Sequence, residues 1–145
     1  MTISDTYALW GRRWTPEEMA DIVCPVMEAP DWNAINCVAI GLAESGGYEW
    51  ATNLVDHNPD ASAFLSLDLG IWQTNTFWHP NLGIRDAYTP EVQIVYVEKI
   101  AKKEGEWGYD WSLWVTWKNG AYKQFLGAAR EAVNAWRQRN DLEPI

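Results

Sequence analysis

The chain has 145 residues, of which 48% are hydrophobic and 21% are charged, a length and composition typical of one compact domain with a buried core. Its net charge of −9 opposes long-range attraction to nucleic acids and anionic lipids, so no nucleic-acid partner is expected. No apolar run reaches the roughly 18 residues of a membrane span, and the N-terminus lacks the apolar stretch of a secretion signal. We therefore expect a single domain over residues 1–145, made in the cytoplasm, without membrane insertion and monomeric if free.

Tryptophan is the outlier of the composition, with 11 copies. Buried indoles are ordinary packing residues, and Trp50, Trp72 and Trp117 fit that role. Exposed indoles also offer flat apolar faces on which sugar rings stack. The excess of tryptophan is compatible with carbohydrate binding but does not select it over core packing.

Two helices are predicted in the first third of the chain. The run Thr15-Pro16-Glu17-Glu18 combines a capping side chain, a proline at the first helical position and a glutamate three residues after the cap. Pro25 should end or kink this helix. A second helix is expected from Asp31 to the Gly46-Gly47 pair, with one apolar face formed by Ile35, Val38, Ala39 and Leu42. Glu44 then lies in the last turn of an amphipathic helix, and the two helices form a hairpin.

Two cysteines lie in this hairpin. Cys24 and Cys37 are about equally far from the turn at Pro30, so antiparallel helices bring them to similar heights. A disulfide is one outcome and a pair of reduced core cysteines is the other. The missing secretion signal favours the reduced pair, because thiols stay reduced in the cytoplasm.

The rest of the chain predicts an α+β fold that is mainly α. Residues 48–75 lose the helical period and carry turn residues, which indicates a loop and a small β-hairpin with short runs at 63–67 and 70–73. Further helices are expected after Thr89-Pro90, around residues 111–117 and near the C-terminus. The first of these should be central and buried through Val92, Val95, Tyr96 and Ile100. The last should pack through Phe125, Ala129, Val133 and Trp136.

Two acidic residues meet the needs of glycosidic bond cleavage. That reaction takes a carboxylic acid still protonated near neutral pH and, for hydrolysis with retention, a second carboxylate on the other side of the sugar. Glu44 follows an apolar stretch at a helix C-terminus, where the helix dipole disfavours negative charge. Asp68 is the candidate for the second carboxylate. Taken alone, Glu44 would be interpreted as a solvent-facing residue at a helix end.

Three sequence blocks resemble the animal-type lysozymes and, through them, the lysozyme-like superfamily. Glu44-Ser45 matches the Glu-Ser of that family. Residues 66–75, Ser-Leu-Asp-Leu-Gly-Ile-Trp-Gln-Thr-Asn, follow its pattern Ser-x-Asp-x-Gly-x-x-Gln-x-Asn. Residues 114–119, Trp-Val-Thr-Trp-Lys-Asn, are similar to its Trp-Val-Ala-Trp-Arg-Asn. The blocks keep the family's order, and they imply a lysozyme-like fold with a small β-hairpin insertion beside the active-site cleft.

The resemblance implies a role for each matched residue. Glu44 would be the general acid, and Asp68 would be the nucleophile or charge stabiliser. Trp114 would be the indole packed against Glu44, and Asn75 would hydrogen-bond Asp68 or a sugar. The residues that would contact the substrate are Gln73, Asn75, Phe77, Trp78 and Trp114.

The chain also departs from the animal enzymes. Glu44 and Asp68 are 24 positions apart, more than is usual there, which predicts an insertion in the β-region around residues 55–63. The cysteine framework of the secreted enzymes is absent. Glu44-Ser45-Gly46-Gly47 and the later Gly-x-x-Gln also resemble the lytic transglycosylases of bacteria and phages, which share the fold, work with a single glutamate and generally lack an acid where Asp68 stands.

These features leave three hypotheses for the function. The first is a muramidase (lysozyme) that hydrolyses the bond between N-acetylmuramic acid and N-acetylglucosamine in peptidoglycan. The second is a lytic transglycosylase that uses Glu44 alone and forms an anhydro-muramyl product. The third is a non-catalytic wall-binding or phage structural component. The missing secretion signal and the glycine-rich Glu44 motif favour a phage or prophage protein that reaches the wall after release or as part of a virion, with a tail or lysis-cassette partner.

Other candidate sites are weaker. His57 and His79 lack the spacing of a zinc site, so surface or packing roles are expected. The stretch Asp56-His57-Asn58-Pro59-Asp60 begins like a calcium loop, but Ala61 stands where that loop needs glycine and Leu67 where it needs glutamate. We expect no cofactor and no metal.

Overall fold

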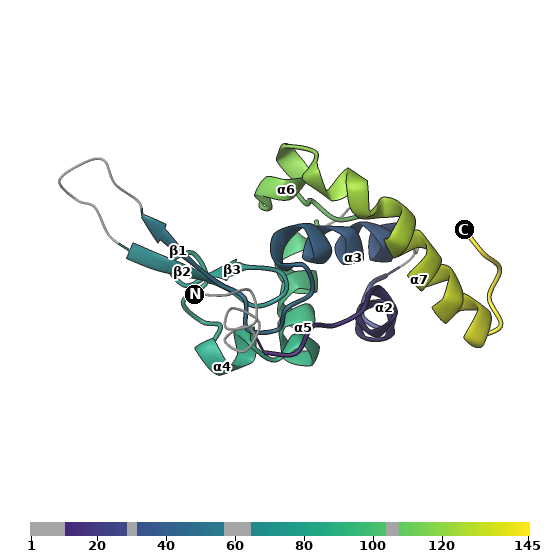
Figure 1. The fold of residues 1–145 in the computed structure, drawn as a ribbon, viewed down its shortest axis with the longest axis horizontal. Helices are drawn as coiled ribbons and strands as arrows, with labels where there is room; N and C mark the ends of the chain where they lie inside the picture. Colours follow the sequence, from purple (N-terminus) through teal and green to yellow (C-terminus); the bar gives the residue numbers. More distant parts are fainter. Residues whose placement is uncertain (1–10, 29–31, 57–64, 104–107) are drawn as a thin grey trace, which may run out of the picture.

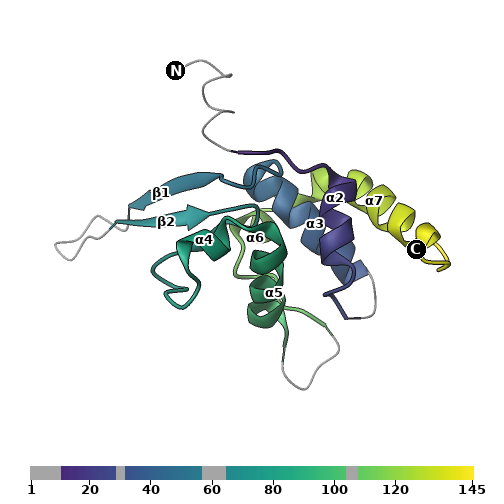
Figure 2. The ribbon, with the colours of Figure 1, turned by 90° about the horizontal axis from the view of Figure 1, so that it is seen from below.

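The computed structural model describes residues 11–28, 32–56, 65–103 and 108–145. In chain order its elements are α2 (Pro16–Val23), α3 (Trp32–Ser45), β1 (Thr52–Asp56), β2 (Leu65–Leu69), β3 (Thr74–Asn75), α4 (Ile84–Ala87), α5 (Pro90–Ala101), α6 (Val115–Lys118), the 3-10 helix η1 (Ala121–Phe125) and α7 (Leu126–Arg139). The helices gather in one body, and the hairpin of β1 and β2 extends away from it (Figures 1 and 2). This is the mainly helical α+β arrangement that the sequence predicts.

Helix α2 begins with the predicted capping box. Thr15 Oγ1 accepts a hydrogen bond from Glu18 N at 3.2 Å, and Glu18 Oε1 accepts one from Thr15 N at 3.1 Å. This reciprocal pair satisfies donors that a helix start would otherwise leave free. The helix ends at Val23, just before Pro25, whose ring is incompatible with a continuing helix.

Helix α3 is the centre of the core. It packs against α2, α6, α7 and η1, and Figures 1 and 2 show it between α7 and α5. The predicted stripe is buried, together with residues on the flanks of the helix: Ala34, Ile35, Cys37, Val38, Ala39, Ile40 and Leu42. A helix covered around most of its circumference is a rigid support for whatever its last turn carries.

Helix α5 turns a different face inward than the sequence predicts. Val92 and Val95 of the expected stripe are 42% and 44% exposed. The buried residues of α5 are instead Pro90, Gln93, Ile94, Val97 and Ala101. The prediction was wrong because it chose one of two apolar stripes: Ile94, Val97 and Ala101 form the other, and the buried, hydrogen-bonded Gln93 lies on their side of the helix. The central buried helix is α3 rather than α5.

The strands in the described part of the chain form one antiparallel sheet in the order β1-β2-β3. The sequence predicts a hairpin here, but residues 70–73 form the turn between β2 and β3 instead of a strand. The register pairs Asn53 with Asp68 and Asp68 with Asn75. Directly paired residues point to the same side of a sheet, so these three side chains share one face. The predicted insertion falls mostly on residues 57–64, outside the described ranges.

A buried amide holds the turn between β2 and β3 against α5. Gln93 Nε2 donates to Leu69 O at 2.8 Å and to Thr74 Oγ1 at 3.2 Å, and Gln93 Oε1 accepts from Trp72 N at 3.3 Å. Gln93 is 0% exposed, so these bonds replace the water it loses. Gly70, with a φ of 77°, lies at the start of this turn.

The two cysteines are buried and free. Burial raises the pKa of Cys24 to about 12 and also raises that of Cys37. A thiol with a raised pKa forms little thiolate, so both side chains serve as packing groups. None of the helices in the described ranges combines the length and the apolar character needed to cross a bilayer.

Candidate active site

A cleft of about 550 Å³ lies between the sheet, the C-terminal end of α3 and the segment around α6. Its lining mixes carboxylates, amides and apolar surface. Among the described residues that line it are Glu44, Asp68, Asn75, Trp78, Trp114 and Lys118. A groove of this size with a few convergent polar groups is typical of a small-molecule or oligosaccharide site.

Glu44 reaches this cleft from the last turn of α3. Its Oε1 accepts a hydrogen bond from Thr116 Oγ1 at 3.0 Å and a longer one from Thr116 N at 3.5 Å. Burial raises the pKa of the Glu44 carboxyl, the bonds from Thr116 lower it in part, and the charge of Asp68 raises it again. The net effect is a raised pKa, which is the direction that a carboxyl group needs to act as an acid near neutral pH.

Asp68 lines the cleft from β2 and is held by its cross-strand neighbour. Asn75 Nδ2 donates to Asp68 Oδ1 at 2.8 Å and to Ser66 Oγ at 2.9 Å. Asn75 Oδ1 accepts from the backbone N–H groups of Phe77 and Trp78 at 2.9 and 3.3 Å. The amide is therefore fixed at both ends and keeps the carboxyl of Asp68 at a defined place in the cleft.

Two buried indoles join the walls of the cleft. Trp72 in the β2–β3 turn donates from Nε1 to Cys37 O of α3 at 2.9 Å. Trp114, which precedes α6, donates from Nε1 to Trp72 O at 2.8 Å. Both N–H groups find an acceptor on a neighbouring segment, so no buried donor is left unpaired. The network fixes the segments that carry Glu44, Asp68 and Trp114 relative to one another.

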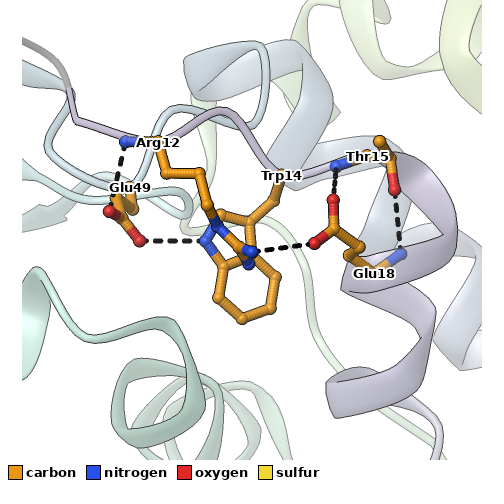
Figure 3. Close-up of polar contacts among 5 residues, drawn as sticks. All are labelled: Arg12, Trp14, Thr15, Glu18 and Glu49. Carbon is orange, nitrogen blue, oxygen red and sulfur yellow. Dashed lines mark hydrogen bonds and ion pairs between the residues drawn. The ribbon is translucent and has the colours of Figure 1, made fainter. Parts of the chain in front are cut away.

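A polar cluster fastens the turn after Glu44 to the segment before α2 (Figure 3). Glu49 accepts hydrogen bonds from Arg12 N at 3.1 Å and from Trp14 Nε1 at 3.0 Å. The Arg12 guanidinium lies 4.3 Å from the centroid of the Trp14 ring and pairs with Glu18 of α2 at 3.0 Å. The cluster therefore ties the C-terminal end of α3 to the start of α2 and limits movement of the helix end that carries Glu44.

The turn that this cluster fastens requires glycine. Gly46 and Gly47 have φ angles of 68° and 91°, a region that side chains with a Cβ disfavour. Gly47 O accepts a hydrogen bond from Trp14 N at 2.8 Å. A Cβ on Gly47 would lie 2.5 Å from Trp14 O. The glycine pair after Glu44 thus ends α3 and lets the N-terminal segment approach.

A family model described as a lysozyme-like domain matches residues 29–116. The chain belongs to this lysozyme-like family. The matched range contains Glu44, Asp68, Asn75 and Trp114, and it confirms the resemblance to the lysozyme-like superfamily. Membership indicates an enzyme that acts on peptidoglycan, as a muramidase or a lytic transglycosylase. Comparisons with curated proteins and with solved structures found no match.

The structure of this lysozyme-like domain brings most of the predicted site residues together. The predicted residues that line the cleft are Glu44, Asp68, Gln73, Asn75, Trp78 and Trp114. Asn75 makes the predicted hydrogen bond to Asp68. Phe77 is not part of the cleft lining; it is exposed and packs edge-on against Trp78, with 4.7 Å between the ring centroids. Of the predicted aromatic pair, Trp78 is therefore the one that faces the cleft.

Gln73 reaches the cleft, but its amide is already bonded inside the lysozyme-like domain. Its Nε2 donates to Ala51 O at 3.0 Å and to Gly70 O at 2.9 Å, and its Oε1 accepts from Asn53 Nδ2 at 2.6 Å. Its backbone has a φ of 49°, which is uncommon for a residue other than glycine. We interpret Gln73 as a support for the β2–β3 turn rather than as a substrate ligand.

Several residues in or beside the cleft are missing from the predicted site, among them His79, Lys118 and Thr116. His79, for which a surface or packing role is expected, packs edge-on against Tyr96, with its Nδ1 2.9 Å from Tyr96 Oη, and it also lines the cleft. Burial lowers the pKa of His79 and so favours the neutral ring. Lys118 adds a positive charge to the lining, and Thr116 bonds Glu44. Thr116 and Lys118 lie in the third sequence block, residues 114–119, whereas His79 lies outside all three blocks.

No metal centre is apparent within the described ranges, where no group of three or more His, Cys, Asp or Glu side chains gathers closely enough to hold an ion. Asp56 ends β1. The rest of the calcium-like stretch, with His57 and Asp60, lies outside the described residues.

Proposed function

We propose that this lysozyme-like domain is a muramidase that hydrolyses the bond between N-acetylmuramic acid and N-acetylglucosamine in peptidoglycan. One observation carries the proposal: a partly buried Glu44 whose pKa is raised shares a cleft with Asp68, which Asn75 holds in place. Two carboxyl groups with different surroundings are the arrangement that separates an acid from a charge stabiliser.

In this proposal Glu44 gives its proton to the glycosidic oxygen. The bond between that oxygen and C1 of the sugar then breaks, and the leaving sugar departs with a hydroxyl group. Positive charge develops at C1, where Asp68 stabilises it or forms a covalent bond to it. Water then adds its hydroxyl to C1, which breaks the bond to Asp68 where one has formed and frees its carboxylate, and the remaining proton of that water goes to Glu44.

The rim of the cleft offers surfaces for sugar rings. Trp78 is 66% exposed and lines the cleft, so its indole can stack on the apolar face of a sugar. Leu113 and Val115 add exposed apolar surface on the opposite segment, next to Trp114. Apolar faces with a few hydrogen-bonding groups between them suit an uncharged glycan backbone.

A lytic transglycosylase is the second candidate, favoured by the Glu44-Ser45-Gly46-Gly47 motif. In that reaction Glu44 protonates the same oxygen, and a hydroxyl oxygen of the muramyl sugar itself attacks C1 and gives up its proton. The product is an anhydro sugar, and no second carboxylate is required. Asp68 would then hold the loop through Asn75 without taking part in the reaction.

Mass spectrometry of peptidoglycan fragments distinguishes these candidates. We expect purified peptidoglycan treated with the protein to yield reducing muramic acid ends, and Asp68→Asn to yield far fewer of them. The matched control is Asp86→Asn on α4, an exposed carboxyl outside the cleft. The transglycosylase would be favoured if the new ends were lighter by one water than hydrolysed reducing ends, and if Asp68→Asn formed them as fast as the wild type. If the wild type produced no new ends, the remaining hypothesis would be a wall-binding protein without catalytic activity.

A further inference from the structure

Among the described residues, Thr116 supplies both hydrogen bonds that the carboxyl group of Glu44 accepts. The Thr116 hydroxyl lies 3.0 Å from Glu44 Oε1, and the Thr116 backbone nitrogen lies 3.5 Å from the same oxygen. The other carboxyl oxygen, Oε2, has no hydrogen-bond partner within the described ranges. The two residues are 72 positions apart in the chain, and folding brings α3 and α6 into contact.

The types of donor decide which oxygen of Glu44 carries the proton. A backbone N–H can only donate, so Oε1 acts as the acceptor for Thr116 N. The Thr116 hydroxyl can donate to the same oxygen. An oxygen that accepts two hydrogen bonds from the protein is a poor place for the proton of a neutral carboxyl group. The proton is then carried by Oε2, the oxygen that is free to meet a substrate.

We propose that Thr116 is a positioning residue for the acid: its hydroxyl holds Glu44 Oε1 and thereby assigns the transferable proton to Oε2. This rests on the proposed function, because it requires Glu44 to act as an acid. Thr116 replaces the alanine of the animal-type Trp-Val-Ala-Trp pattern. The hydroxyl is therefore a feature of this chain and not of that pattern.

The groups around Glu44 give the direction in which its pKa should change when the Thr116 hydroxyl is removed. The other titratable groups of the cleft lining are Asp68 on β2, His79 after β3 and Lys118 on α6, and Lys123 lies on η1, which packs on α3. Burial raises the pKa of Glu44, whereas the bond from the Thr116 hydroxyl lowers it. A donor to the carboxylate stabilises the ionised form, so its removal should raise the pKa of Glu44 further.

The test compares wild type, Thr116→Val and Thr116→Ser in peptidoglycan cleavage as a function of pH. Valine keeps the shape and the backbone N–H but lacks the hydroxyl. We expect Thr116→Val to lose about tenfold in kcat, the scale of one ordinary hydrogen bond, with little change in KM. The pH at which activity falls on the alkaline side should move upward. Thr116→Ser keeps the donor and should retain both the rate and the pH profile.

Two results would overturn the proposal. Thr116→Val with the kcat and pH profile of the wild type would mean that the hydroxyl is not needed. Thr116→Ser with the same loss as Thr116→Val would mean that the methyl group, through packing, is what matters. Urea unfolding of each variant identifies losses that come from the fold. If Thr116→Val does not fold, Thr116→Ala compared with Thr116→Ser carries the same test.

A measurement that needs no enzymatic activity tests the role of Thr116 separately from the proposed function. The carboxyl carbon of Glu44 can be titrated by NMR in wild type and variants, whether or not any of them cleaves peptidoglycan. A higher pKa in Thr116→Val than in Thr116→Ser supports the role of the hydroxyl. Equal values in the two variants contradict it. An inactive wild type would reject the muramidase while leaving this comparison intact.

Discussion

Glu44→Gln is expected to reduce the rate of peptidoglycan cleavage by at least about a hundredfold, because general acid catalysis typically contributes that much or more. Glutamine has nearly the same shape and can still accept the hydrogen bond from Thr116, but it has no acidic proton to transfer to the glycosidic oxygen. The rate of release of soluble fragments from purified peptidoglycan measures the effect.

The matched control for this variant is Glu91→Gln. Glu91 is an exposed carboxyl in the first turn of α5, outside the cleft lining, so its neutralisation should leave the rate unchanged. Equal activity of Glu44→Gln and wild type would remove Glu44 from the mechanism. That result would favour the hypothesis of a non-catalytic wall-binding or structural component.

Unfolding experiments show whether a loss of activity in Glu44→Gln comes from the fold. The pKa of Glu44 is raised in the folded state. The protonated carboxyl therefore stabilises the folded state fully at pH values below the pKa that Glu44 has in the unfolded chain. This stabilisation is lost as the pH rises through the folded-state value. At neutral pH Glu44→Gln should therefore unfold at the same or a higher urea concentration than the wild type, and this difference should shrink in acid.

Gly70→Ala is expected to lower the free energy of unfolding by at least about 3 kcal/mol, or to prevent folding. Gly70 has a φ of 77°, and an added Cβ would lie 2.1 Å from Ala87 O and 2.8 Å from Gln93 Oε1. The backbone at Ala87 cannot move away without displacing α4, and Gln93 holds the turn that follows Asp68. Urea denaturation followed by tryptophan fluorescence measures the change.

Gly127→Ala is the matched control for this substitution. Gly127 is exposed in α7, and an added Cβ would meet no atom within 4 Å. Alanine favours a helix over glycine, so the free energy of unfolding should stay the same or rise by up to about 1 kcal/mol. If Gly70→Ala were as stable as Gly127→Ala, the close packing of the β2–β3 turn against α4 and α5 would be wrong.

The features that the sequence predicts correctly are local. The capping box at Thr15 involves residues three positions apart, and the stripe of α3 follows the helical period, so both are visible without knowledge of the fold. Pro25 and the Gly46-Gly47 pair mark helix ends for reasons of backbone geometry alone. These signals place Glu44 in the last turn of a buried helix.

The features that the sequence misses depend on contacts between distant segments. Gln93 is buried because Leu69, Thr74 and Trp72 satisfy its amide, and no pattern within α5 contains that information. Its burial places Val92 and Val95 on the outer face of α5 and Val97 on the inner face. The same holds for Gln73, whose partners on Ala51 and elsewhere appear only after the sheet has formed.

The candidate site shows the same division. Glu44, Asp68 and Trp114 were predicted by resemblance, because each lies in a short block with characteristic neighbours. Their roles in catalysis remain part of the proposed function. His79 lies outside these blocks, and Thr116 lies in the third block but stands where the animal-type pattern has alanine. Their place in the site follows from the packing of α6 against α3 and from the loop after β3, which only the structure shows.

Titration of the Glu44 carboxyl group by carbon NMR tests the central claim most directly, with Glu44→Gln used to assign the resonance. The account predicts that Glu44 takes up its proton at a pH clearly above the value of about 4.3 for an exposed glutamate, because burial and the charge of Asp68 outweigh the bonds from Thr116. A midpoint at or below that value would contradict the account, because Glu44 would then be ionised at neutral pH with no proton to transfer.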